Sequence, residues 1–220
     1  ATAMYAYSTS LLIKMGKAIG KDVSYYEEMY PVILEQYRKH YLNTGKVEHE
    51  TQTANVLALY FNLTDNRERE AEKLVKDIEE CGHLKTGFVG TPYLLHVLQD
   101  IGRTDLAYKL LLKDTFPSWL YSVKMGATTM WERWDGMKPD GSFATPEMNS
   151  FNHYAYGAVG DWMFSTVAGI RPDENEPGYK HIIFEPKPNK ELGYAKARIL
   201  TKNGEIISSW EYKGDSNLCE

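Results

Sequence analysis

The chain has 220 residues, of which 43% are hydrophobic and 25% are charged, as in an ordinary globular protein with a sizeable core. Its formal net charge of −5 gives no electrostatic basis for binding nucleic acid or an anionic membrane. No apolar run approaches the ~18–20 residues of a membrane span, and the first residues lack a signal-peptide pattern, so the compartment stays open.

The cysteines and histidines give no pattern for a disulfide framework or a metal site. Cys81 and Cys219 are the two cysteines, and Cys219 lies in the polar tail SNLCE. His49 and His83 lack zinc-ligand spacing. We therefore expect no metal and no cofactor. Because the chain starts with Ala1 inside a helical pattern, we expect a fragment or a processed product.

The first half of the chain is predicted to form helices joined by short turns. The predicted N-caps are Ser24, with Glu27 as its capping-box partner, then Thr51 or Thr53, then Asp65 or Asn66. The helix from Ser24 runs to about Leu42. The helix REREAEKLVKDIEEC has apolar residues at Leu74, Val75 and Ile78, and we expect its ionic face to be solvated.

Further helices are predicted at Gly90–Gly102, Thr104–Asp114 and Pro117–Lys124. A final long helix is predicted over Asn149–Ile170, with Asn149 or Ser150 as its N-cap. Paired helices of modest length with short connections favour a toroid of helical hairpins, an (α/α) barrel, over a simple four-helix bundle.

After Gly169 the pattern changes. Arg171–Tyr179 has the composition of a linker, and alternating segments at His181–Glu185, Tyr194–Lys202 and Glu205–Trp210 predict strands. Asn203-Gly204 predicts a hairpin turn between the last two strands. We expect residues 1–170 to be helical, and residues 171–220 to hold a linker and either a truncated β-sandwich or an apron on the helices.

The stretch Gly126–Gly160 carries the strongest functional signal. It contains WERWD and SFNH, which mix aromatic faces with Glu, Arg, Asp, Asn and His side chains. Such a mixture suits a pocket for a polar, ring-shaped ligand better than an apolar core.

Glu132 is the first catalytic candidate, because an aromatic-walled loop can partly desolvate a carboxylate while Arg133 holds it ionised. A Glu–Arg pair on an ordinary loop is the alternative. His153 is expected near a helix start, where the dipole favours a neutral imidazole that can bind a sugar hydroxyl; a structural hydrogen bond is its alternative. The remaining local carboxylates give no convincing acid, and Asp140 in KPDGS is a turn residue; they are Asp135, Asp140, Glu147 and Asp161.

The sequence resembles the C-terminal part of bacterial α-L-rhamnosidases, which are inverting glycoside hydrolases of family 78 with an (α/α)6 barrel. The motifs that carry the resemblance are TQTANVLAL, HLKTGFVGTPYLL, DLAYKLLL, PSWLY, GATTMWERWDG, PDGSF and MNSFNHYAYGAVGDW. The resemblance implies a mainly α fold: an incomplete (α/α)6 barrel followed by the first strands of a C-terminal β-sandwich.

The same resemblance implies roles for four residues. Glu132 matches the general base that activates water, and His153 matches a residue that contacts rhamnose in the −1 subsite. Trp131 and Trp134 match wall or supporting residues of that pocket. The family's general acid lies in a DxRxE motif that these 220 residues lack, so we expect the acid upstream of Ala1 and little or no activity from the fragment alone.

The expected ligands are glycosides or plant polysaccharides that contain L-rhamnose, with neither nucleic acid nor membrane as a partner. Self-association of the fragment is also expected, because helical surface normally covered by the absent half would be exposed. Two alternatives stay open: a non-catalytic carbohydrate-binding helical module, and another (α/α)-barrel glycosidase or lyase.

Overall fold

The computed structural model describes residues 1–42 and 51–213, so Cys219 and the residues His49 and Glu50 lie outside it. The chain divides into two compact units, Ala1–Ala107 and Tyr108–Glu220, and the division falls within helix α6 (Thr104–Leu112). Among the described residues, no helix combines the length and the apolar character that crossing a lipid bilayer needs.

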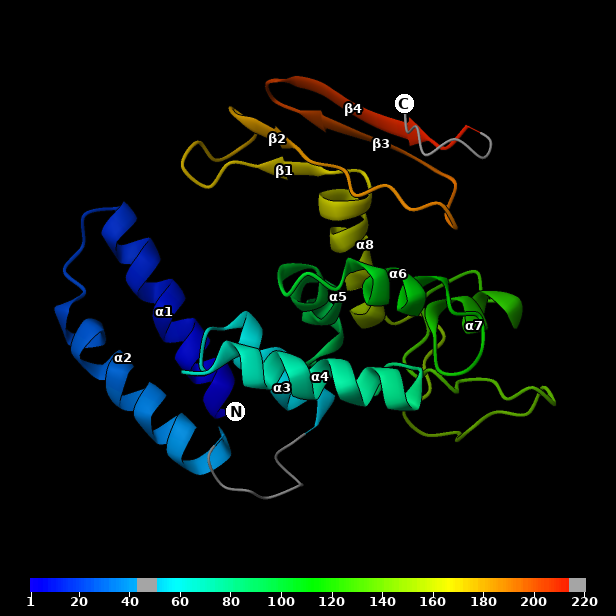
Figure 1. Ribbon diagram of the computed structural model, residues 1–220, viewed down its shortest axis with the longest axis horizontal. Helices are drawn as coiled ribbons and strands as arrows, with labels where there is room; N and C mark the ends of the chain where they lie inside the picture. The colour runs from blue at the N-terminus through cyan, green and yellow to red at the C-terminus, as the bar shows by residue number, and fades with distance from the viewer. Residues whose placement is uncertain (43–50, 214–220) are drawn as a thin grey trace. The chain divides into compact units, whose positions relative to one another are not determined.

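The first unit begins with two long helices, α1 (Thr2–Ala18) and α2 (Ser24–Tyr37), which lie side by side in Figure 1. A short π-helical turn, η1 (Arg38–Leu42), extends α2. Small residues of α1 pack into the core, whereas Met15 and Ile19 are exposed. Self-association through that exposed apolar surface stays a prediction.

The predicted capping box at the start of α2 is wrong. Ser24 is the first helical residue, and no side chain caps the helix at the preceding Val23. The Ser24 backbone N–H and its Oγ–H instead both donate to Asp22 Oδ1, at 3.0 and 2.7 Å. Glu27 forms an ion pair with Lys17, so its carboxylate is engaged by the neighbouring helix.

The other helices of the first unit are α3 (Gln52–Tyr60), α4 (Arg67–Cys81) and α5 (Thr91–Asp100). The predicted caps Thr51 and Asn66 are confirmed: Thr51 Oγ1 accepts from Ala54 N–H and Asn66 Oδ1 from Arg69 N–H. The expectation that the ionic face of α4 is solvated is wrong at Glu70. Its side chain is buried, and its Oε1 accepts from Arg69 Nε at 2.7 Å.

In the second unit, α7 (Trp119–Lys124) is capped by the Ser118 hydroxyl, which accepts from Tyr121 N–H at 3.0 Å. A long irregular segment follows. The next helical segment consists of η3 (Ala155–Ala158, a 3-10 turn), α8 (Val159–Trp162) and η4 (Met163–Val167, a π-helical turn).

The predicted single helix over Asn149–Ile170 is therefore wrong at both ends. Asn149 donates its side-chain N–H to the Gly136 carbonyl, and Ser150 Oγ accepts from Asn152 N–H at 3.1 Å in a non-helical turn, so neither residue caps a helix. Trp162 and Val167 of this segment are buried. Ile170 belongs to a strand, which the linker prediction missed.

Four strands complete the second unit as two antiparallel hairpins. β1 (Ile170–Pro172) pairs with β2 (Ile182–Phe184), and β3 (Tyr194–Thr201) pairs with β4 (Gly204–Glu211). The predicted hairpin between the last two strands is confirmed, but its turn lies one residue earlier than predicted: Gly204 pairs with Thr201, so Lys202 and Asn203 are the turn residues.

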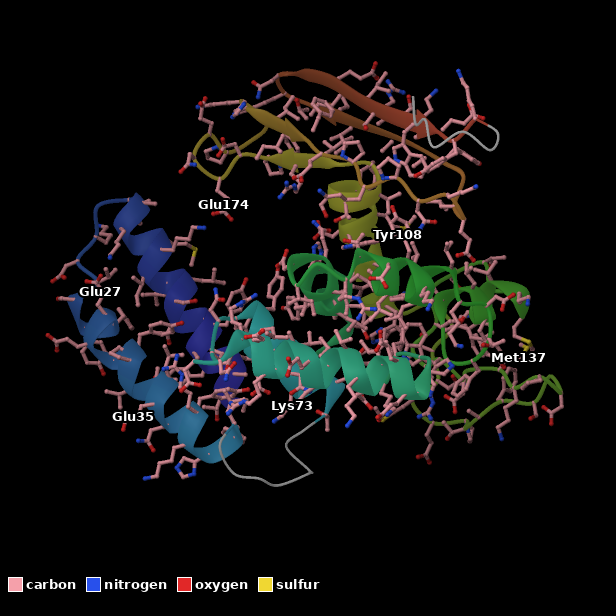
Figure 2. The ribbon with its side chains drawn as sticks, viewed as in Figure 1. Glu27, Glu35, Lys73, Tyr108, Met137 and Glu174 are labelled. Carbon is pink, nitrogen blue, oxygen red and sulfur yellow. The ribbon has the colours of Figure 1, made fainter. Side chains whose placement is uncertain are left out.

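The strands pack against the end of the helical segment, as Figure 1 shows for α8 and the hairpins. Ala168, Ile170 and Ile206 form a small apolar cluster. Trp210 Nε1–H donates to the Val167 carbonyl and the Ser208 hydroxyl donates to the Ala168 carbonyl, both at 2.6 Å. Tyr108, labelled in Figure 2, adds a hydrogen bond from its hydroxyl to the Lys187 carbonyl. The helical segment thus has a rigid support at its C-terminal end.

Gly169 allows the helical segment and the strands to pack closely where the chain passes from one to the other. Its φ is +68°, and a Cβ at this position would lie 2.0 Å from Pro186 N and 2.4 Å from Glu185 C, both backbone atoms. A side chain therefore meets an unfavourable backbone conformation and a steric clash at the same position.

We expect Gly169→Ala to destabilise the protein by several kcal/mol more than Gly178→Ala. Gly178 is the matched control, because its φ is +80° and a Cβ there meets nothing within 4 Å. The control substitution should cost only about 1–2 kcal/mol, the penalty of a left-handed conformation. Urea unfolding of both variants measures the difference, and equal losses would contradict this explanation.

Candidate active site

Two segments of the second unit are joined by backbone hydrogen bonds, and they carry the predicted site residues. Glu132 N–H donates to the Ser150 carbonyl and His153 N–H donates to the Met130 carbonyl, each at 2.8 Å. The Thr129 hydroxyl also donates to the Phe151 carbonyl. The structure therefore places Glu132 and His153 on neighbouring segments, although 20 residues separate them along the chain.

The Glu132 carboxylate is held by the main chain. Its Oε2 accepts a hydrogen bond from Ser150 N–H at 2.8 Å, and the residue is half-buried. A backbone donor fixes the direction of one carboxylate oxygen without neutralising the charge, and the second oxygen keeps its acceptor capacity. This geometry suits a group that must accept a proton from a small molecule.

Both the catalytic interpretation of Glu132 and its alternative paired Arg133 with Glu132, and both are wrong on this point. Its Nε–H donates to Asp135 Oδ1 at 3.0 Å, so the neighbouring carboxylate, and not Glu132, is its ion-pair partner. The Asp135 carboxylate raises the pKa of the Arg133 guanidinium above its usual value. Arg133 and Asp135 thus form a local pair beside the candidate base.

Both tryptophans of the WERW motif pack against other aromatic rings. Trp131 is 4% exposed, and its ring meets Phe151 edge to face with centroids 5.1 Å apart. Trp134 stacks on Tyr156 at 3.8 Å with an interplanar angle of 18°. Because the Tyr156 carbonyl in turn accepts from Trp119 Nε1–H at 2.9 Å, the motif is tied to α7. These rings brace the backbone on either side of Glu132.

The chain between the two segments forms a hairpin. Met137, labelled in Figure 2, pairs with Phe143, and Lys138 N–H donates to the Ser142 carbonyl at 2.8 Å. Asp140 accepts from both the N–H and the hydroxyl of Ser142 at the tip, which confirms its predicted place in a turn. The same hydrogen bonds hold the pKa of the Asp140 carboxyl below its usual value.

Asn149 closes the base of this hairpin. Its Nδ2–H donates to the Gly136 carbonyl at 2.9 Å. A Cβ on Gly136 would lie 3.0 Å from Asn149 Oδ1 and 3.2 Å from the Trp131 ring, so a side chain has little room there. This hydrogen bond between Asn149 and Gly136 places Ser150, the next residue, where its N–H can donate to Glu132. Residue types alone do not reveal this contact, because a backbone N–H is the donor.

His153 lies on a loop two residues before the helical segment that begins at Ala155. Its Nδ1 accepts a hydrogen bond from Ala155 N–H at 3.4 Å. The imidazole lies parallel to the Tyr154 ring, with an interplanar angle of 5° and centroids 5.9 Å apart.

A hollow of ≈ 630 Å³ opens beside His153. Its lining residues are Thr129, Met130, Asn152, His153, Tyr154, Gly157 and Ala158. His153 can be predicted from the sequence, but Met130 and Tyr154 cannot, because neither residue type indicates a site without its neighbours. Within residues 1–42 and 51–213, no three or more His, Cys, Asp or Glu side chains gather in a way that could hold a metal ion.

We expect Asn149→Asp to loosen the pairing between the two segments. The substitution keeps the shape of the side chain but replaces the N–H donor with an oxygen that repels the Gly136 carbonyl. Amide hydrogen exchange should become faster at Glu132 and His153, the two residues whose N–H groups join the segments. Asp140→Asn, at the hairpin tip, is the control and should leave both rates unchanged. Unchanged exchange rates in Asn149→Asp would show that the Asn149–Gly136 hydrogen bond does not hold the two segments together.

Comparison with known proteins relates this arrangement to one family. Residues 1–167 match the bacterial alpha-L-rhamnosidase 6 hairpin glycosidase domain, and residues 169–219 match the bacterial alpha-L-rhamnosidase C-terminal domain. The predicted fold class is confirmed by these matches: a mainly helical part of a six-hairpin domain, followed by small β-sheets.

Two similar proteins are alpha-L-rhamnosidases. The chain is 46% identical to an alpha-L-rhamnosidase of Streptomyces avermitilis over 97% of its length, and 42% identical to one of Formosa agariphila over 100%. It spans 21% and 24% of the lengths of these two relatives.

Solved structures of alpha-L-rhamnosidases are also similar to this chain. The Streptomyces avermitilis enzyme, crystallised in complex with L-rhamnose, superposes with a TM-score of 0.91, covering 97% of this chain and 21% of that one. The native Aspergillus terreus enzyme has a TM-score of 0.89 at 36% identity, covering 96% of this chain and 25% of that one. This chain therefore belongs to the bacterial alpha-L-rhamnosidase family.

Proposed function

We propose that the protein carrying this chain removes terminal α-L-rhamnose from rhamnosides by an inverting mechanism, with Glu132 as the general base. The observation that carries the proposal is the Glu132 carboxylate, which the Ser150 N–H holds at 2.8 Å on a segment hydrogen-bonded to that of His153. Family membership supports the reaction, and the L-rhamnose complex of the Streptomyces avermitilis relative supports the sugar.

In this mechanism the Glu132 carboxylate takes a proton from a water molecule. The water oxygen forms a bond to the anomeric carbon as the glycosidic bond breaks, and the electron pair of that bond leaves with the aglycone oxygen. A carboxylic acid protonates the leaving oxygen. In inverting enzymes the two carboxyl groups are about 6.5–9.5 Å apart, which leaves room for the water.

The oxygen of Glu132 that Ser150 does not hold is the one we assign to the water. Because the backbone hydrogen bond orients the carboxylate, proton acceptance requires no rearrangement of its side chain. The packed rings of Trp131 and Trp134 would support this geometry from behind, as pocket support with little or no direct sugar contact. Removing either ring would then lower the rate of catalysis by displacing Glu132.

His153 is proposed to bind a hydroxyl group of the rhamnosyl unit. The contact would be made by the imidazole ring, whose Nδ1 accepts from Ala155 N–H at 3.4 Å. Its backbone bond to Met130 keeps the ring beside the Glu132 segment. A hydrogen-bonding ring at this position would orient the sugar beside the base.

The general acid is proposed to come from a DxRxE motif outside these 220 residues. Catalysis by inversion needs both carboxyl groups, so we propose that the chain alone has little or no activity. The substrates would be glycosides or plant polysaccharides that end in L-rhamnose.

We expect Glu132→Gln to lower kcat for 4-nitrophenyl α-L-rhamnoside by about 10²–10⁴-fold in the natural full-length polypeptide that carries these residues. The amide keeps the size of the side chain but cannot accept the proton. Glu147→Gln is the matched control, since Glu147 is an exposed carboxylate of the same loop, and it should retain full turnover. Wild-type turnover in Glu132→Gln would contradict the role of Glu132 as the general base.

The stereochemical outcome gives an independent prediction. Attack by water on the face opposite the leaving group converts the α-glycoside into β-L-rhamnose as the first product. Proton NMR of the anomeric region during the first minutes of hydrolysis should show the β signal before mutarotation produces the α form. An α product formed first would require a retaining mechanism, with Glu132 in a different role.

A further inference from the structure

We infer that Asn203 is a site of spontaneous covalent modification, at which the backbone nitrogen of Gly204 displaces the side-chain amide and leaves aspartate or isoaspartate in the β3–β4 turn. This reaction is independent of the proposed function. Three features of the hairpin point to it: the residue that follows Asn203, the exposure of Asn203 to water, and the hydrogen bond that its amide makes.

The neighbour of Asn203 leaves the route to its side chain open. Asparagine is a chemically labile residue, and Gly204 follows Asn203 directly, whereas every other asparagine of the chain precedes a residue with a side chain. A Cβ at Gly204 would meet nothing within 4 Å, so the space beside this backbone is empty. The Gly204 nitrogen can therefore approach Asn203 Cγ without steric hindrance.

The hairpin requires a glycine at this position. Gly204 has a φ of +131°, a backbone conformation that residues with a side chain rarely adopt. The Thr201 hydroxyl fixes the chain around it, because it accepts from Asn203 N–H at 3.1 Å and donates to the Gly204 carbonyl at 2.9 Å. The glycine that allows the turn is thus the same residue that leaves the amide open to attack.

The Asn203 side chain is exposed and joins two loops. Its Nδ2–H donates to the Gly178 carbonyl at 3.0 Å, on the connection between β1 and β2. That connection carries Glu174, labelled in Figure 2, and its ends are held together by the contact of His181 Nδ1 with Asp173 Oδ2 at 2.8 Å. The Asn203 amide therefore links the β3–β4 turn to the β1–β2 connection.

The reaction needs water but neither an oxidant nor an enzyme. The Gly204 nitrogen gives up its proton to water or hydroxide and forms a bond to Asn203 Cγ. The bond from Cγ to Nδ2 breaks, and the nitrogen takes up a proton and leaves as ammonia. Water then opens the cyclic imide. Attack at Cγ breaks the new bond and gives aspartate, whereas attack at the backbone carbonyl carbon breaks the original peptide bond and gives isoaspartate.

Both products lose the hydrogen bond to Gly178. A carboxylate has no N–H to donate, and its oxygens repel the carbonyl oxygen that the amide bound. Isoaspartate also lengthens the main chain inside the turn that sets the β3–β4 register. That register packs Ile206 against Ala168 and brings Trp210 to the Val167 carbonyl. Modification at Asn203 thus weakens the strand support of the helical segment.

Incubation of the natural full-length polypeptide in mildly alkaline buffer, followed by peptide mass spectrometry, tests the reaction. The peptide that contains Asn203 should gain the mass difference between NH2 and OH, and its aspartate and isoaspartate forms should elute separately. Asn175 is the internal control: it is also exposed and its Nδ2–H donates to Asp173 at 3.2 Å, but Glu176 follows it. Asn175 should stay intact until most of Asn203 has been converted.

A sample unfolded in urea and incubated in parallel shows how fast the Asn203-Gly204 pair reacts without the hairpin. Conversion of Asn203 is expected in both samples. If Asn203 converts in urea and stays intact in the folded protein, the turn protects the amide and the inference is overturned. Conversion of Asn175 as fast as Asn203 in the folded protein would equally contradict a special role for the glycine.

Asn203→Gln separates the reaction from its structural effect. Glutamine keeps a side-chain amide, but its attack by the Gly204 nitrogen requires a larger ring, which closes much more slowly. After the same incubation, amide hydrogen exchange should become faster over residues 173–181 and 194–211 of the wild-type protein and stay unchanged in Asn203→Gln. Equal exchange before and after incubation of a fully converted wild-type protein would show that the modification does not weaken the hairpin.

Discussion

The site depends on the hydrogen bonding between the chain around Glu132 and the chain around Ser150. The two backbone bonds from Glu132 and His153 set the separation of the segments, and the bond from Ser150 N–H to Glu132 Oε2 orients the carboxylate. Backbone donors have fixed positions once the chain is packed, so the carboxylate needs no other side chain to direct it. The hollow beside His153 arises from the same pairing.

The surrounding structure keeps this pairing in place from two sides. On one side, Asn149 binds the Gly136 carbonyl, and the rings of Trp131 and Trp134 pack on their neighbours. On the other, the helical segment after His153 is anchored through Trp210 to the β3–β4 hairpin. Gly169 allows the chain to turn from helix to strand there, since a Cβ would strike the Pro186 backbone.

The helix predictions held where local signals decide the outcome and failed where a distant partner competes. Thr51 and Asn66 cap their helices because each side chain finds an N–H group three residues ahead. Asn149 and Ser150 carry equally good capping signals, but the Asn149 side chain donates to the Gly136 carbonyl and Ser150 Oγ accepts from Asn152 N–H in a non-helical turn. The chain at 149–154 is consequently irregular, and His153 is presented by a loop instead of a helix.

The sequence by itself determined the mainly helical class, the β3–β4 hairpin and the family, because these follow from periodicity, turn chemistry and long motifs. It also singled out Glu132 and His153 as candidates. Only the tertiary structure decided that Ser150 N–H holds the carboxylate, that Arg133 pairs with Asp135, and that Tyr154 stands exposed beside a hollow. The reason is physical: a backbone N–H is common to every residue except proline, and its partner is chosen by packing between segments far apart in the chain.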